Sequence, residues 1–128
     1  MSADLSMTQL AEHVRTALET ADLDRFADLL APDVTWGAPD DPAPSCRNRS
    51  QVLDWYHKGR AAGVRAVVVD ITTYPSKLLV ALALTSDGAP PAEPVADRWQ
   101  VLTVAAGRVR DIRGYDDHEA ARKAAQAG

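Results

Sequence analysis

The sequence lacks several features that would place it in a membrane or in a secreted, disulfide-stapled scaffold. Its longest apolar-rich stretch, residues 77–84, is far too short to span a bilayer. The N-terminus has no basic region followed by an apolar run, so no signal peptide is expected. The single cysteine, Cys46, cannot form an internal disulfide. We therefore expect a soluble, cytoplasmic protein that does not associate with membranes.

The chain also lacks the patterns that hold nucleic acids, cofactors or metals. Its 14 Lys and Arg residues are scattered and are outnumbered by 18 Asp and Glu residues, so no patch of positive potential is expected to bind nucleic acid. No Gly-rich phosphate loop, GxSxG or CxxC motif is present, which predicts no cofactor. His13, His57 and His118 lack the spacing of metal ligands, which predicts no metal site.

The 128 residues suit one domain, and their periodicity divides the chain into a helical half and a strand half. Apolar residues at helical spacing predict helices over about 8–21, 23–30 and 50–60. Thr8 is expected to cap the first helix, and Asn48 or Ser50 the third. β-Branched residues and recurring turns predict strands over 33–37, 64–73, 77–86, 95–105 and 108–115, before a short helix over 118–127.

Helices followed by four consecutive antiparallel strands indicate an α+β fold, with the early helices packed on one face of a curved antiparallel sheet. A sheet that curls around helices encloses a cone. The cone predicts a pocket at its open end.

Three phrases in a fixed order carry a resemblance to a known family: ETADLDRFADLLAPDVTW, RNRSQVLDWYHKG and DRWQVLTVAAGRVRDIRGYDD. Together they resemble the NTF2-like superfamily and, within it, the SnoaL-like group of small bacterial proteins. The resemblance implies a curved sheet with three helices, a deep pocket at the wide end and a homodimer through the outer sheet face. Because this superfamily includes enzymes, transport factors and binding domains, the fold alone does not assign a function.

The catalytic positions of related enzymes are only partly filled in this chain. Resemblance to the steroid isomerases of the superfamily places Val14 at their tyrosine and Gly37 at their general-base aspartate, and Asp97 is the nearest match to their protonated aspartate. Resemblance to the polyketide cyclases and limonene-epoxide hydrolases places Gly114 where a catalytic aspartate stands. Acid/base chemistry would therefore depend on the remaining carboxylates.

Asp97 and Asp116 are the candidate catalytic residues. If Asp97 faces the pocket beside Trp99, burial would raise its pKa and allow it to donate a proton. The alternative is a structural cross-strand pair with Arg110 or Arg113. Asp116 and Asp117, which precede the last helix, have the alternative role of stabilising its N-terminus.

Strand alternation, anchored on the resemblance, directs Ile112, Gly114 and Asp116 inward and Arg113 and Tyr115 outward. A β-bulge near Gly114 would exchange the inward and outward directions of the last two pairs in this series. Cys46 precedes Arg47, which would lower its pKa, but no histidine is adjacent, so we expect a packing role rather than a nucleophile.

Six of the seven aromatic rings, three Trp and three Tyr, have a polar edge, and Phe26 is the exception. Rings of this kind suit a pocket for a flat or cyclic ligand, because each supplies contact area and one hydrogen bond. The alternative is that they fill the core. The predicted substrate-binding residues are Trp36, Trp55, Tyr56, Trp99, Ile112 and Tyr115.

Two functions remain open from the sequence. The leading hypothesis is a SnoaL-like protein that binds a small, largely apolar organic molecule, with cofactor-free isomerisation, cyclisation or hydrolysis by Asp97 or Asp116. The alternative is a non-catalytic binding or dimerisation module, favoured by the residues at positions 14, 37 and 114.

Overall fold

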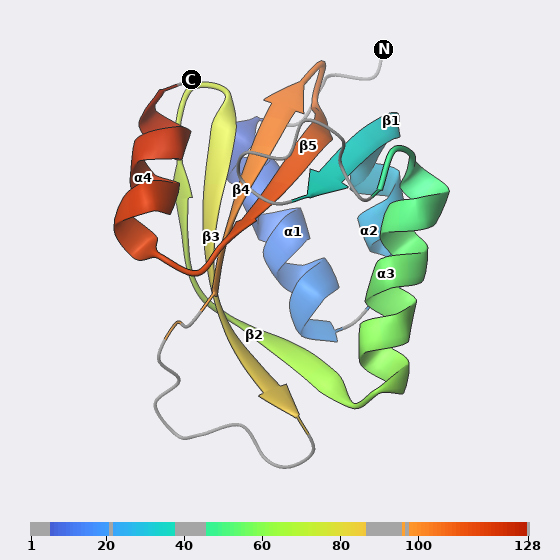
Figure 1. Cartoon of the computed structure of the whole chain (residues 1–128). Helices are drawn as coiled ribbons and strands as arrows, with labels where there is room; N and C mark the ends of the chain where they lie inside the picture. Colours follow the sequence, from blue (N-terminus) through green and yellow to red (C-terminus); the bar gives the residue numbers. More distant parts are fainter. Residues whose placement is uncertain (1–5, 21, 38–45, 87–95, 97, 128) are drawn as a thin grey trace.

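The computed structural model describes residues 6–20, 22–37, 46–86, 96 and 98–127, which form four helices and five strands (Figure 1). The helices are α1 (Met7–Thr20), α2 (Leu23–Leu29), α3 (Arg49–Ala61) and α4 (His118–Gln126). The strands are β1 (Leu30–Gly37), β2 (Val64–Thr73), β3 (Lys77–Ser86), β4 (Arg98–Ala105) and β5 (Arg108–Tyr115). Asp97 and the start of the strand predicted from residue 95 lie outside the described residues.

Polar side chains set where the helices begin. Ser6 accepts a hydrogen bond from the backbone N–H of Gln9, and the Gln9 side chain accepts one from the N–H of Ser6. This reciprocal capping box makes Ser6 the cap of α1, so the prediction of Thr8 is wrong. Asn48 caps α3 as predicted, because its side chain accepts from the backbone N–H of Gln51 at 2.9 Å.

The strands form one sheet in the order β1-β5-β4-β3-β2. Strands β2 to β5 pair antiparallel in sequence order, as predicted. The short strand predicted over 33–37 begins earlier, at Leu30, and it runs parallel to β5, so the sheet is mixed rather than wholly antiparallel. This pairing joins residues as far apart in sequence as Thr35 and Asp111, a distance that local patterns do not reveal.

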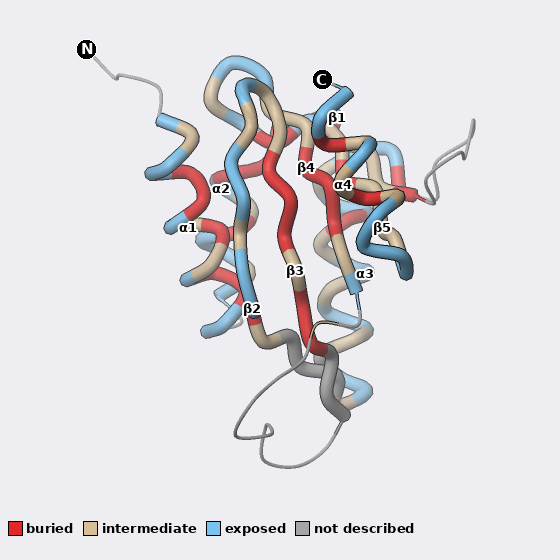
Figure 2. Tube along the Cα trace, turned by 90° about the vertical axis from the view of Figure 1, so that its left-hand side faces the viewer, coloured by how far each residue is buried: buried red, intermediate tan, exposed pale blue. Residues whose placement is uncertain are grey.

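Helices cover both faces of the sheet. Helices α1, α2 and α3 pack on one face, which we call the inner face, and α4 packs on the other, the outer face (Figure 1). In a view turned by 90°, β3 runs between α1 and α4 and is buried along most of its length (Figure 2). The main core lies against the inner face and includes Leu10, Val14, Phe26, Leu102 and Ile112.

The outer face has a smaller core of its own. Ala121 and Ala125 of α4 pack against Leu79 and Val101 of the sheet. The Lys77 ammonium group donates a hydrogen bond to a backbone carbonyl near the end of α4, at 3.0 Å. The last helix therefore covers part of the surface through which dimerisation was expected.

A bulge in β5 changes the register of the last hairpin. Val104 pairs with Val109, but Thr103 pairs with Asp111, so β5 has one extra residue opposite β4. The bulge therefore lies near Arg110 rather than near Gly114.

This register decides which side chains of β5 face the helices. Paired residues of antiparallel strands point to the same side of a sheet. Gly114 lies opposite Gln100 on the inner face, and Tyr115 lies opposite Trp99 on the outer face. Ile112 and Gly114 are thus inward and Tyr115 is outward, as the alternation predicted.

Candidate functional site

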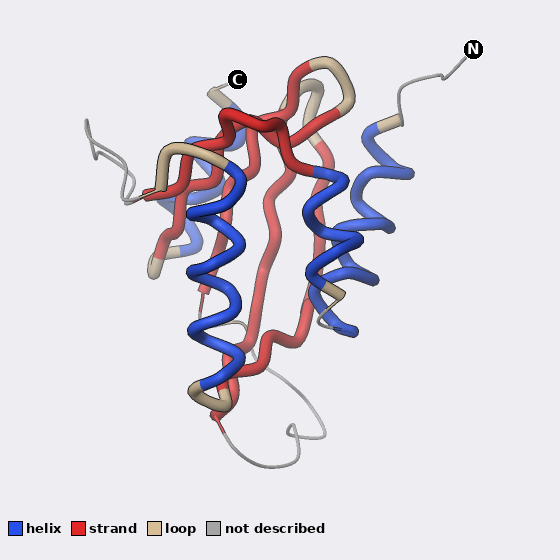
Figure 3. Tube along the Cα trace, turned by 90° about the vertical axis from the view of Figure 1, so that its right-hand side faces the viewer, coloured by secondary structure: helices blue, strands red, loops and turns tan. Residues whose placement is uncertain are grey.

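Helix α3 runs along the inner side of the sheet and presents two different surfaces (Figure 3). The first surface packs toward the sheet, and the second lines a hollow at the side of the helix. Both follow from helical spacing, because residues three and four apart share a face. The residues facing the sheet include Val52 and Tyr56; those at the hollow are Gln51, Asp54, Trp55 and Lys58.

A polar pair joins α3 to the middle of the sheet. Gln100 is 8% exposed and is the only buried polar side chain among the described residues. Its Nε2 donates a hydrogen bond to the hydroxyl oxygen of Tyr56 at 3.3 Å, while the Tyr56 ring contacts the edge of Phe26, with centroids 5.1 Å apart. Burial raises the pKa of Tyr56 to about 12, although the bond from Gln100 acts in the opposite direction. The hydroxyl therefore stays protonated at physiological pH.

This pair has hydrogen-bonding capacity that the described part of the chain does not use. The Tyr56 oxygen accepts from Gln100, which leaves its O–H free to donate. The Gln100 carbonyl oxygen has no partner among the described residues either. A donor and an acceptor thus lie side by side on an otherwise apolar inner face.

Open space adjoins the pair on the sheet side. Gly114 lies directly opposite Gln100, and a Cβ atom added to Gly114 would meet no heavy atom within 4 Å. The same holds at Gly59, three residues after Tyr56 on α3. The Gly114 position therefore leaves room beside the Gln100 side chain.

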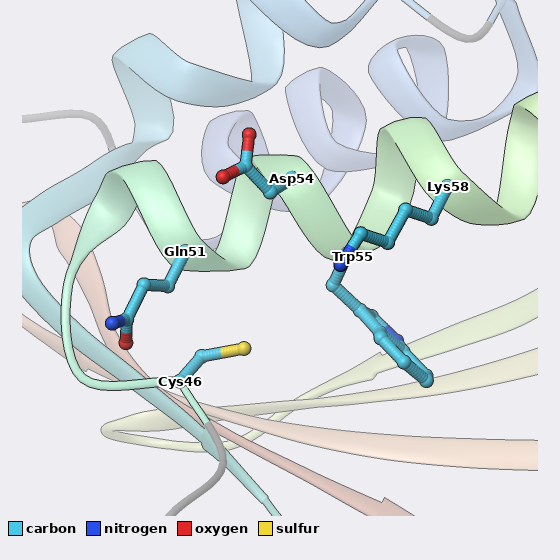
Figure 4. A pocket seen from close by; sticks show the side chains of 5 residues that line it. All are labelled: Cys46, Gln51, Asp54, Trp55 and Lys58. Atoms are coloured by element: carbon cyan, nitrogen blue, oxygen red, sulfur yellow. The ribbon is translucent and has the colours of Figure 1, made fainter.

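The second surface of α3 borders a hollow of about 270 Å³, whose other wall is Cys46 (Figure 4). The Trp55 ring lies 5.2 Å from that of Trp36, centroid to centroid, and Trp55 is 52% exposed. Cys46 is held there by a β-bridge between its backbone and that of Trp36. The Nε1 atom of Trp36 is buried and has no hydrogen-bond partner among the residues that the structure describes.

The environment of the Cys46 thiol raises its pKa and does not activate it as a nucleophile. Burial raises its pKa most, nearby Asp54 raises it further, and Lys58 acts in the lowering direction. Arg47 is not among the groups that shift it, so the expectation that Arg47 lowers this pKa is wrong. The thiol is protonated at neutral pH, in keeping with the packing role expected from the sequence.

A family model for the SnoaL-like domain matches residues 10–112, most of the chain. The chain belongs to the SnoaL-like family. A comparison with curated proteins finds no significant match.

Solved structures share the fold of this SnoaL-like domain at low sequence identity. One is a proposed polyketide cyclase from Sinorhizobium meliloti, with 21% identity, TM-score 0.63 and coverage of 83% of this chain and 93% of that one. A proposed ketosteroid isomerase from Kribbella flavida has 20% identity, TM-score 0.67 and coverage of 85% and 76%. An uncharacterised cystatin-fold protein from Novosphingobium aromaticivorans has 14% identity, TM-score 0.70 and coverage of 87% and 98%. No helix in the described ranges is long and apolar enough to cross a membrane.

The SnoaL-like domain does not gather its predicted aromatic residues around one cavity. Trp36 and Trp55 are in contact, but Tyr56 points toward Phe26. Trp99 belongs to the outer-face cluster, where its ring stacks on His118 at 5.4 Å with an interplanar angle of 7°. The prediction that Trp99 converges with the other rings is therefore wrong. On β4 it is the neighbouring Gln100 that faces inward.

Tyr115 packs against the same outer-face cluster as Trp99, away from the inner face. Ile112 does face inward, but it is fully buried in the main core.

Of the two candidate catalytic carboxylates, the structure describes Asp116. Asp116 is exposed in the bend between β5 and α4, and not inward as alternation predicted, because β5 ends at Tyr115. Its neighbour Asp117 caps α4, accepting from the backbone N–H of Ala120 at 3.3 Å. Asp97 lies outside the described residues, so both interpretations of it stay predictions.

Sequence reasoning missed Gln100 as a site residue. Apolar residues stand on both sides of it, and Trp99 and Val101 are apolar because α4 covers the outer face. The available signal was the isolated amide within the run RWQVLTV. Polar residues inside an apolar strand require a partner or a function.

Proposed function

We propose that this SnoaL-like domain binds a small, neutral organic molecule between α3 and the inner face of the sheet. The observation that carries the proposal is the pair of partly buried Tyr56 and buried Gln100, with unused hydrogen-bonding capacity, beside the open space at Gly114. Buried polar groups are normally satisfied within a protein, so an incompletely used pair favours an external partner.

The lining favours a ligand that combines an apolar body with a hydrogen-bonding group. The described residues of the main core are apolar, so the surroundings of the pair would cover a hydrocarbon ring or chain. The Tyr56 hydroxyl is suited to donate to a carbonyl or hydroxyl oxygen. An ionised ligand is disfavoured, because the side chains that pack around Tyr56 here are apolar and an unpaired charge is costly to bury.

The names of two structural neighbours agree with this chemistry. They refer to polyketides and to ketosteroids, which are organic carbonyl compounds with large apolar parts. Because these proteins are about one-fifth identical to this chain, their names support a class of ligand and do not supply a particular one.

The test compares three ligands of similar shape by amide NMR titration. We expect 2-acetylnaphthalene, which has a carbonyl acceptor, to bind more tightly than naphthalene, and 2-naphthoate to bind least. Tyr56→Phe should remove the preference for the carbonyl compound, and Gly114→Val should weaken all binding by filling the space. Asp70→Asn, on an exposed part of β2, is the matched control. Equal binding of the three ligands to the wild-type protein and Tyr56→Phe would overturn the proposal.

A catalytic form of this function depends on Asp97. We propose that, if the bound molecule is transformed without a cofactor, Asp97 supplies the proton transfer, because it is the nearest match in this chain to the protonated aspartate of the steroid isomerases. Substrate turnover that persists at the wild-type rate in Asp97→Asn would remove this role. Asp116 is the second candidate, and its exposed position makes Asp116→Asn the variant expected to retain activity.

Dimerisation through the outer sheet face also belongs to the proposal. Because α4 occupies part of this face, a second copy would have to use the neighbouring surface, toward the edge strand β2 where Val69 is exposed. Light scattering at micromolar concentration should give twice the chain mass. A monomer mass would contradict the proposed dimer and leave the ligand site unaffected.

A further inference from the structure

The hollow beside α3 is separate from the Tyr56–Gln100 pair. Its helical wall consists of positions 51, 54, 55 and 58, which share one stripe of α3, whereas Tyr56 belongs to the stripe that faces the sheet. Figure 4 shows Cys46 and Trp55 projecting toward the space between α3 and the strands, with Asp54 and Lys58 on the same stretch of helix. A ligand in this hollow would therefore contact a different set of groups.

An exposed indole forms the apolar part of the hollow. Trp55 rests against Trp36, yet about half of its surface stays open to solvent. Large aromatic side chains usually bury most of their area, and exposed ones are enriched at binding sites. The contact with Trp36 fixes the Trp55 ring at little further entropic cost, so its open side is prepared for a planar group.

Two opposite charges on the same stretch of α3 also line the hollow, and Figure 4 shows Lys58 beside the base of Trp55 and the Asp54 carboxylate turned away from the ring. Asp54 and Lys58 stand four residues apart on α3, in the order that favours an ion pair along a helix. They nevertheless form no ion pair within 4.0 Å, and neither has another charged partner in the described part of the chain. Each charge is therefore available to a ligand, and both lie near the uncharged Cys46 thiol.

We propose that this hollow binds a small zwitterion with an aromatic group, the chemistry of a free aromatic α-amino acid. Its ammonium group would pair with Asp54, its carboxylate with Lys58, and its ring would stack on Trp55. A ligand with one charge would satisfy one of these side chains and be repelled by the other. The volume of about 270 Å³ lies just below the usual range for ligand pockets, roughly 300–1,000 Å³, which suits a molecule of amino-acid size.

The test uses L-phenylalanine and two analogues that each lack one charge: 3-phenylpropionate, without the ammonium group, and phenethylamine, without the carboxylate. Binding is measured by NMR titration of the full chain, with the indole N–H signal of Trp55 as the local probe. We expect L-phenylalanine to bind most tightly. Trp55→Ala should weaken its binding about tenfold, and Asp54→Asn and Lys58→Gln each about two- to fivefold, as for exposed ion pairs.

The charge variants should also change selectivity in opposite directions. Asp54→Asn should remove the advantage of L-phenylalanine over 3-phenylpropionate, and Lys58→Gln its advantage over phenethylamine. Asp70→Asn and Lys123→Gln remove matching exposed charges elsewhere and should change nothing. Urea unfolding of each variant confirms that it is folded. The proposal would be overturned by equal binding of the three ligands, by chemical-shift changes that leave the Trp55 indole signal in place, or by no binding at millimolar concentration. None of these results bears on the inner-face site.

Discussion

Replacing Gln100 by leucine separates a ligand-binding role from a structural one. Gln100 is almost fully buried, and its amide makes one long hydrogen bond, 3.3 Å, to Tyr56. A structural amide in the core should be needed for stability. A binding amide should be dispensable for stability, because part of its hydrogen-bonding capacity serves the ligand.

The expected change in unfolding free energy is small because the contributions oppose each other. Loss of the hydrogen bond lowers the free energy of unfolding by about 0.5 kcal/mol, the low end of the usual range, because the bond is long. The Tyr56 oxygen is left without a donor, which lowers the free energy of unfolding by about 1 kcal/mol more. The apolar burial added by the leucine side chain raises the free energy of unfolding by about 1 kcal/mol. The net change for Gln100→Leu is therefore within about 1 kcal/mol of zero.

Urea unfolding followed by circular dichroism, at fixed protein concentration, measures this change. The control is Leu102→Ala, which removes a buried neighbour on the same face of β4 and should cost about 2–5 kcal/mol. The same Gln100→Leu protein should bind 2-acetylnaphthalene about two- to tenfold more weakly. If Gln100→Leu lost more than about 2 kcal/mol of stability while keeping its affinity, the pair would be a structural link and the reasoning would fail.

Three further predictions follow from the same geometry. The pKa of Tyr56 in the folded protein, about 12, exceeds its usual value of 10, so its contribution to stability should be present below about pH 10 and be lost as pH rises toward 12. The difference in tyrosinate absorbance between the wild-type protein and Tyr56→Phe should show this late titration step. A midpoint near 10 would contradict it. Asp54→Asn should speed alkylation of Cys46 by iodoacetamide and Lys58→Gln should slow it, since Asp54 raises the thiol pKa and Lys58 lowers it; equal rates would disprove the coupling. Gly59→Ala should raise stability by about 0.5–1 kcal/mol in urea unfolding, because the added Cβ meets nothing within 4 Å and glycine is a poor helix former; a loss of stability would show that the space is occupied.

Much of the fold was readable because its signals are local. Leu10, Val14, Ala17 and Leu18 recur at helical spacing, and all of them are buried in α1. The antiparallel pairing of β2 with β3 and of β4 with β5 follows from short turns, such as that at Gly107, where positive φ suits glycine. The cap of α1 is Ser6 and not the predicted Thr8, because a capping box needs a polar partner three residues later and Gln9 supplies that partner to Ser6.

The sequence by itself determined the family, the order of the elements and the identity of the residues available for chemistry. The order of the elements follows from periodicity along the chain, and the family follows from the resemblance of three phrases and the match of the SnoaL-like model. Only the tertiary structure decided which residues meet. The parallel pairing of β1 with β5 is long-range, and a single extra residue in β5 places Gly114 opposite Gln100 rather than Trp99. The extra residue therefore decides which β5 side chains face the helices. Gln100 and Trp99 take opposite faces through the alternation of β4 itself, and only the packing of the helices puts the amide against Tyr56 and the indole beneath α4.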